Sequence, residues 1–140
     1  MTEIIKKIIN DIDENKINNE KEYFLFHQYR FEYIFSLLKK YDNNKLLLDI
    51  RAHYLHGLLG AFHLGYKNIF GTDIDIFNSI STDRAKKINA IIKNCDLKKE
   101  NIPFHYQSFD IILLAETLEH FNFHPKKVFK ENRQSIKTKR

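Results

Sequence analysis

The chain has 140 residues, 43% of them hydrophobic and 29% charged, and a formal net charge of +5 at pH 7. This length and composition predict one globular domain with its own core and exclude a disordered chain. No apolar run approaches the roughly 20 residues of a membrane-spanning helix, and the first residues lack the apolar segment of a signal peptide, so we expect a cytoplasmic protein without a membrane span.

The first part of the chain predicts two helices. A helix over residues 3–13 places five isoleucines on one side, and the polar, Asn-rich residues 14–22 predict a loop. A second helix over residues 22–41 has a candidate buried face made of Phe24, Phe31, Ile34, Phe35 and Leu38. Asp42-Asn43-Asn44 ends this helix, because short polar side chains compete for backbone hydrogen bonds. We therefore expect an N-terminal helical segment over residues 1–44.

From residue 45 onward, short apolar runs alternate with helical patterns. The runs predict strands over residues 46–50, 68–73, 90–96 and 109–114, and the helical patterns cover residues 54–64, 78–87 and the segment that starts at His124-Pro125. Strands that alternate with helices pair in parallel through crossovers. The predicted fold class is α/β, with a Rossmann-like parallel sheet of about four strands that two helices precede. Cys95, the single cysteine, is expected to be a small buried hydrophobe in a reducing compartment.

The fourth predicted strand is followed by an acidic cluster. Five apolar residues in succession, residues 111–115, are typical of a strand that helices cover on both faces. Glu116, Glu119 and His120 come directly after this run. Ligands of open α/β sheets bind at the carboxyl ends of the strands, so these side chains fall where a site is expected.

Six short motifs follow one another in residues 45–140. They are Leu48-Asp49-Ile50, Gly65-Tyr66, Gly71-Thr72-Asp73-Ile74-Asp75, Asn101-Ile102-Pro103-Phe104, Ser108-Phe109-Asp110 and Glu116-Thr117-Leu118-Glu119-His120. In this order they resemble the class I S-adenosylmethionine-dependent methyltransferases, from about residue 45 to residue 136. The subgroup that the chain resembles most methylates small molecules, including quinones and sugars. The resemblance implies the N-terminal part of that fold, S-adenosylmethionine as cofactor and a small-molecule acceptor.

The resemblance also implies a cofactor site at the strand ends. Asp49 would face the methionine end of the cofactor, and Asp73 would accept hydrogen bonds from the ribose hydroxyls. Asp96 and Leu97 would contact the adenine, and Glu116 would border the cofactor and substrate pocket. The implied cofactor-binding residues are Asp49, Arg51, Asp73, Ile74, Asp96, Leu97 and Glu116.

The loop after the first strand departs from the family pattern. Where the family has Asp-x-Gly-x-Gly-x-Gly, this chain has Asp49-Ile50-Arg51-Ala52-His53-Tyr54-Leu55. Glycine serves there because the backbone turns tightly and approaches the cofactor closely. We expect His53 or Leu55 to project into the cofactor space unless the loop takes another path, whereas Arg51 offers a partner for the cofactor carboxylate. A non-catalytic methyltransferase-like remnant, or a subunit that acts through a partner, is therefore an open alternative.

The last residues also differ from the family pattern. The chain ends after the helix that follows the fourth strand, and residues 134–140 replace the usual Lys-Pro-Gly-Gly turn. We therefore expect a truncated relative whose fourth strand lies at the edge of the sheet. An apolar edge strand invites a partner chain or self-association.

Three other kinds of chemistry receive less support from the sequence. His53, His56 and His63 have a spacing that suits a shared helical face but no clear carboxylate or cysteine complement, so no metal is predicted. His120 is a hypothetical general base, and no catalytic residue is assigned. The basic residues after position 125, with the aromatic and basic residues of the second helix, leave open a module that binds nucleic acid. Helical spacing favours core packing for those aromatic residues.

Overall fold

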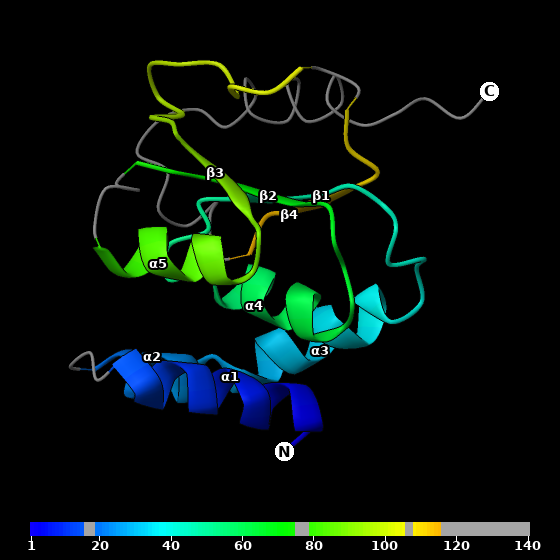
Figure 1. Ribbon diagram of the computed structural model, residues 1–140, viewed down its shortest axis with the longest axis vertical. Helices are drawn as coiled ribbons and strands as arrows, with labels where there is room; N and C mark the ends of the chain where they lie inside the picture. Colours follow the sequence, from blue (N-terminus) through cyan, green and yellow to red (C-terminus); the bar gives the residue numbers. More distant parts are fainter. Residues whose placement is uncertain (16–18, 75–78, 106–107, 116–140) are drawn as a thin grey trace.

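The computed structural model describes residues 1–15, 19–74, 79–105 and 108–115 (Figure 1). The helices and strands of these residues are α1 (Glu3–Asn15), α2 (Glu20–Phe26), α3 (Gln28–Leu38), β1 (Leu47–Ile50), α4 (His56–His63), β2 (Ile69–Asp73), α5 (Ser79–Lys87), β3 (Ile91–Asn94) and β4 (Ile111–Leu113). Every predicted strand is present, with ends that differ by no more than two residues from the prediction.

The four strands form one parallel sheet with the order β3-β2-β1-β4. Leu47 of β1 lies opposite Ile69 of β2 and Ile111 of β4, which fixes the register of the central strands. All residues of β1 are buried, as a central strand requires. The sheet and its crossovers confirm the predicted α/β, Rossmann-like fold class.

β4 lies at one edge of the described sheet, and its residues are only partly buried. The expectation of a strand fully covered on both faces was therefore wrong for Ile111–Leu113. Among the described residues, β4 pairs with β1 alone. Self-association along this strand stays a prediction.

Two hydrophobic clusters lie on opposite faces of the sheet. Figure 1 shows the described helices on one face, with α4 and α5 next to the strands and α1 to α3 farther away. The helix-side cluster includes Ile4, Ile5, Ile8 and Ile12 of α1, which confirms the predicted isoleucine face. The segment between β3 and β4 covers the other face with Leu97, Ile102 and Phe109, and Cys95 is buried there as predicted.

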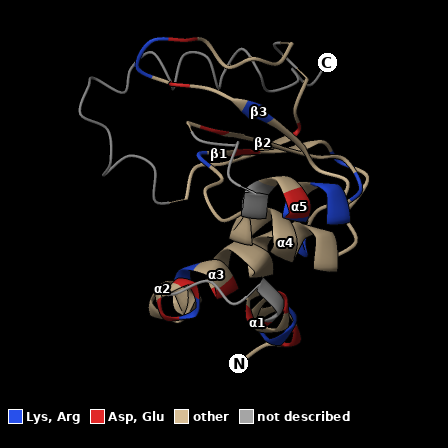
Figure 2. Cartoon of the chain, turned by 60° about the vertical axis from the view of Figure 1, so that its left-hand side comes forward, with Lys and Arg blue, Asp and Glu red and all other residues tan. Residues whose placement is uncertain are grey.

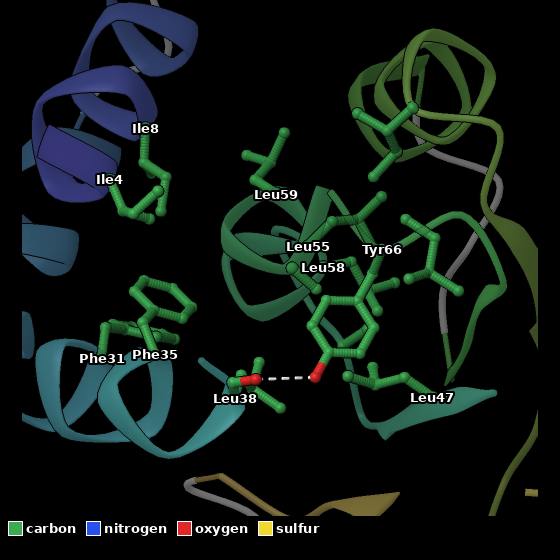
Figure 3. Close-up of a cluster of buried hydrophobic side chains, with 14 of the residues drawn as sticks. Ile4, Ile8, Phe31, Phe35, Leu38, Leu47, Leu55, Leu58, Leu59 and Tyr66 are labelled. Atoms are coloured by element: carbon green, nitrogen blue, oxygen red, sulfur yellow. Dashed lines mark hydrogen bonds between the residues drawn. The ribbon is translucent and has the colours of Figure 1, made fainter. Parts of the chain in front are cut away.

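The N-terminal helices pack on α4 (Figure 3). Phe35 of α3 lies so close to Gly60 of α4 that a β-carbon at residue 60 would stand 2.1 Å from the ring. The Tyr66 hydroxyl donates a hydrogen bond of 2.8 Å to the carbonyl oxygen of Leu38 at the end of α3. The division of the chain at residue 44 stays a prediction.

The predicted second helix is divided at His27 into α2 and α3. The amides of Arg30 and Phe31 donate to the His27 carbonyl oxygen, at 3.1 and 3.3 Å, and so begin a new helix there. The predicted loop over residues 14–22 is also too long, because α1 continues to Asn15 and α2 begins at Glu20. The break after residue 41 is present, and Asp42 Oδ1 accepts the Asn44 amide at 2.9 Å.

Acidic and basic residues are mixed along α1 and α2 (Figure 2). None of the described helices has the length and apolar character needed to cross a membrane. The predicted last helix, Glu116, His120, His124 and the basic residues after position 125 lie outside the described residues.

Candidate functional site

A cavity of about 250 Å³ lies at the carboxyl ends of β1 and β2. β1 stands between β2 and β4, which is the point where the order of the strands reverses, and open α/β sheets bind ligands at such points. The residues that line the cavity are Tyr23, Phe31, Asp49, Arg51, Ala52, His53, His56, Gly57, Asp73 and Ala115.

The loop between β1 and α4 has an unusual backbone. Arg51, His53 and Leu55 have φ angles of 58°, 47° and 66°, in the left-handed region that favours glycine. These are the three positions that glycine holds in the pattern Asp-x-Gly-x-Gly-x-Gly. The loop therefore has glycine-like dihedral angles without glycine.

Backbone hydrogen bonds hold this loop. The Ala52 amide donates to the Thr72 carbonyl oxygen at 2.8 Å, and the Leu55 amide donates to the Ala52 carbonyl oxygen at 2.7 Å. Of the two residues of which one was expected to project into the site, Leu55 is fully buried in the helix-side cluster and does not line the cavity. His53 does line the cavity, and so does Arg51.

Asp49 is the most unusual titratable group of the cavity. Its side chain is 5% exposed, and Gly57 of α4 packs directly against it. Burial, together with the nearby negative charge of Asp73, raises the pKa of Asp49 from 3.8 to about 8. A buried carboxyl group in this state gains from a cationic or hydrogen-bonding ligand.

Asp73 lies at the end of β2 and also lines the cavity. Its Oδ1 accepts the amide of Ile74 at 2.7 Å, and its carbonyl oxygen accepts the amide of Cys95 at 2.8 Å. The second bond joins the end of β2 to the segment after β3. The residues that follow β3 therefore lie next to Asp73 at the same edge of the sheet.

The structure brings Asp49, Arg51 and Asp73 together in the cavity. Ile74 is exposed and does not line it. Asp96 also lies outside the lining, and its Oδ1 accepts the Lys98 amide at 3.0 Å. Leu97 is buried in the cluster on the other face. The remaining predicted residue, Glu116, lies outside the described residues.

The lining residues that sequence reasoning missed include three aromatic ring side chains, Tyr23 of α2, Phe31 of α3 and His56 of α4. The Tyr23 ring lies 6.0 Å from the His53 ring and 5.7 Å from the Tyr54 ring, measured between centroids. The N-terminal helices thus form one wall of the cavity. The spacing of the aromatic residues favours core packing, which is confirmed for Phe31, but it carries no signal that Tyr23 and Phe31 also line a cavity.

His56 and His63 each lie within hydrogen-bond distance of a different carboxylate. His56 Nε2 donates to Glu20 Oε1 at 2.8 Å, and burial lowers the pKa of His56 despite this acidic partner. His63 Nε2 lies 2.7 Å from Asp11 Oδ2. In residues 1–15, 19–74, 79–105 and 108–115, no group of three His, Cys, Asp or Glu side chains is arranged to hold a metal ion.

The comparisons with known proteins agree with this geometry. A family model described as "Methyltransferase domain" matches residues 54–139, which is more than half of the chain. No curated protein sequence gives a significant match.

Several solved structures share the fold. A protein from Pyrococcus horikoshii OT3 has a TM-score of 0.64 and 23% identity over 87% of this chain and 56% of its own. A Thermotoga maritima protein described as an S-adenosylmethionine-dependent methyltransferase, possibly acting on histamine, has a TM-score of 0.61 and 19% identity over 93% of this chain and 57% of its own. A coclaurine N-methyltransferase, solved with N-methylheliamine and S-adenosylhomocysteine, has a TM-score of 0.61 and 14% identity over 77% of this chain and 33% of its own.

The chain spans less than two thirds of the length of each of these structures. At such identities the likeness concerns the fold, and the match of the family model identifies the family. The chain therefore belongs to the methyltransferase domain family, with the Rossmann-like sheet of the class I S-adenosylmethionine-dependent enzymes.

Proposed function

We propose that this chain binds S-adenosylmethionine at the carboxyl ends of β1 and β2 and takes part in methyl transfer to a small-molecule acceptor. The observation that supports this proposal most is the backbone of residues 51–55. It has left-handed dihedral angles at all three glycine positions of the family pattern, although the side chains there are larger. The loop thus keeps the backbone path of the family's glycine-rich turn, although this path costs an L-residue free energy.

The charges of the cavity suit the two ends of the methionine part of the cofactor. Asp49 would pair with the ammonium group, since a cation offsets the cost of ionising this buried carboxyl group. Arg51, which lines the same cavity, would bind the carboxylate through charge-assisted hydrogen bonds.

Asp73 would accept hydrogen bonds from the ribose hydroxyls, because its carboxylate lines the cavity at the end of β2. The adenine would extend beyond the cavity, toward Ile74, Asp96 and Leu97. A cavity of about 250 Å³ is smaller than most ligand pockets, which agrees with a ligand that it encloses only in part. Glu116 remains a proposed border of the substrate pocket.

The cofactor would supply the methyl group, and the chain would contribute by holding the two reactants in line. No general acid or base is assigned among the described residues. The role of His120 as a base stays a hypothesis. The acceptor is proposed as a small molecule because the motifs resemble the subgroup that modifies such substrates.

Calorimetric titration with S-adenosylhomocysteine tests the cofactor site. We expect micromolar binding to the 140-residue chain and at least a tenfold loss in Asp73→Asn, because a hydrogen bond to a charged group contributes about 1.5–3 kcal/mol. Asp110→Asn is the matched control. Asp110 Oδ2 accepts the Leu46 amide at 2.9 Å at the opposite ends of β1 and β4, so this variant should bind like the wild type.

The absence of heat at millimolar ligand, from a chain that circular dichroism shows to be folded, would overturn the proposal. That result would favour the non-catalytic alternative, in which the chain lends its surface to a partner. Equal losses in Asp73→Asn and Asp110→Asn would place the ligand elsewhere.

A further inference from the structure

A buried ion pair joins the N-terminal helices to the α/β part of the chain. Glu20, the first residue of α2, is fully buried, and Arg84 of α5 is 3% exposed. Arg84 Nη2 donates to Glu20 Oε2 at 3.0 Å, and Arg84 Nη1 donates to Glu20 Oε1. Burial alone would raise the pKa of Glu20, but the hydrogen bonds from His56 and Arg84 outweigh burial and lower this pKa.

The same guanidinium also holds the loop after β1. Arg84 Nη1 donates to the carbonyl oxygen of Tyr54 at 2.9 Å. Tyr54 lies between His53 and Leu55, two of the residues with left-handed dihedral angles. The ion pair therefore fixes a peptide group in the middle of the strained segment.

The helix that carries Glu20 touches this loop a second time. Tyr23, one turn further along α2, places its ring 5.7 Å from the ring of Tyr54. Helix α2 thus contacts Tyr54 at its side chain and, through Arg84, at its backbone.

The ion pair is a costly way to gain stability alone. Taking two charges out of water costs about as much as their attraction returns, so a buried pair is weak evidence for stabilisation. Within the described residues, Arg84 Nε is also buried without a hydrogen-bond partner, which adds to the cost. Such a pair needs another role, and the bond to Tyr54 supplies one.

We infer that Glu20 and Arg84 are positioning residues for the loop 51–55 and replace the conformational preference that glycine gives to this loop in the family pattern. The consequence for ligand affinity rests on the proposed function. The effect on the loop itself does not, because it concerns the backbone of the free chain.

Amide hydrogen exchange, followed by nuclear magnetic resonance, tests the positioning role on the free chain. The amides to follow are those of Ala52 and Leu55, which donate to Thr72 and Ala52. The reference amide is Leu47, which donates to the Asn68 carbonyl oxygen at 3.0 Å. In Arg84→Lys we expect exchange at Ala52 and Leu55 to become at least tenfold faster relative to Leu47, since a lysine cannot bridge Glu20 and Tyr54 with a planar fork.

Asp11→Asn is the matched control. Asp11 joins α1 to α4 and α5 through His63 at 2.7 Å and Lys87 at 3.6 Å, but it does not line the cavity. We expect Asp11→Asn to change the exchange rates of the Ala52 and Leu55 amides by the same factor as that of the Leu47 amide. Should Arg84→Lys fail to fold, Glu20→Gln replaces it, because the glutamine keeps one acceptor for Arg84 and loses the second acceptor and the charge.

Titration with S-adenosylhomocysteine gives the second measurement. We expect Arg84→Lys to bind at least tenfold more weakly than the wild type, and Asp11→Asn to bind equally well. If the wild type does not bind at all, the proposed function fails while the exchange experiment still decides the positioning role. The inference would be overturned if the exchange rates of Ala52 and Leu55 changed by the same factor as that of Leu47 in both variants, whatever the affinity.

Discussion

The carboxyl group of Asp49 lies directly against Gly57, and a β-carbon at residue 57 would stand 2.6 Å from Asp49 Oδ2. Gly57 belongs to the first turn of α4, and Asp49 belongs to β1. This close approach places the start of the helix against the carboxyl group. The position of Asp49 in the cavity therefore depends on glycine, which has no side chain, at residue 57.

Gly57→Ala is expected to destabilise the chain by about 1–3 kcal/mol, the usual cost of overpacking a tight contact. In an Asp49→Ala background most of this cost should disappear, because the atom that clashes is gone. Urea denaturation of the four chains gives the coupling free energy. Gly60→Ala, which meets Phe35 instead, is the control and should cost the same in both backgrounds. Additive effects of Gly57→Ala and Asp49→Ala would contradict the prediction.

Asp49 should also make stability depend on pH. Its pKa is raised from 3.8 to about 8 by burial and by Asp73, so between these values the native state keeps a proton that the unfolded chain has lost. The free energy of unfolding must then fall as pH rises, by up to about 1.4 kcal/mol per pH unit. Above the native pKa the contribution no longer changes.

The variant Asp49→Asn cannot ionise and should lose this slope. Its free energy of unfolding should exceed that of the wild type by a few kcal/mol near the upper end of the window. Urea denaturation at a series of pH values measures the difference. Asp110→Asn should keep the wild-type slope, and an unchanged slope in Asp49→Asn would show that Asp49 is ionised in the native state.

The sequence predicted the sheet because apolar residues follow different patterns in strands and in crossover helices. It did not predict the break at His27, since the helical pattern continues through residues 22–41. Nor did it predict the burial of Glu20, which lies in a polar stretch. The partner that makes this burial possible is Arg84, which is distant in the sequence and close only after folding.

The sequence predicted the part of the candidate site that lies at the ends of the strands. Asp49, Arg51 and Asp73 line the cavity because each lies at or just beyond the carboxyl end of a parallel strand. Tyr23 and Phe31 could not be placed there, since the packing of α2 and α3 on the loop is a tertiary feature. The sequence left open whether His53 or Leu55 enters the cavity, and the structure has His53 in the lining and Leu55 in the core.

His56 should make the chain sensitive to acid. Burial is the largest cause that lowers the pKa of His56 below 6.5, so the native state keeps this ring neutral where the unfolded chain takes up a proton. The free energy of unfolding should therefore fall as pH falls through about 6.5. His56→Gln keeps a hydrogen-bond donor for Glu20 and should show a smaller loss. A ring titration of His56 by nuclear magnetic resonance at or above 6.5 would contradict this prediction.

Two of the left-handed residues of the loop, His53 and Leu55, should respond differently to glycine. His53 is exposed, so His53→Gly removes a strained β-carbon and loses only the ring contacts with Tyr23 and Tyr54. Relief of about 1–2 kcal/mol is opposed by a loss of up to about 1 kcal/mol in chain entropy, and the net effect should be neutral or slightly stabilising. Leu55→Gly relieves the same strain but empties a fully buried site, and should cost about 3 kcal/mol.

The contrast between these variants shows what keeps the loop in shape. Urea denaturation should rank the free energies of unfolding as His53→Gly, at or above the wild type, followed well below by Leu55→Gly. Asn89→Gly is the control, because Asn89 also has a positive φ, 54°, but lies in the turn before β3 and does not line the cavity. If His53→Gly and Leu55→Gly were equally destabilising, burial of Leu55 would not be the anchor of the loop. If Leu55→Gly alone destabilises the chain, core packing has taken over a position where glycine would otherwise supply the conformation.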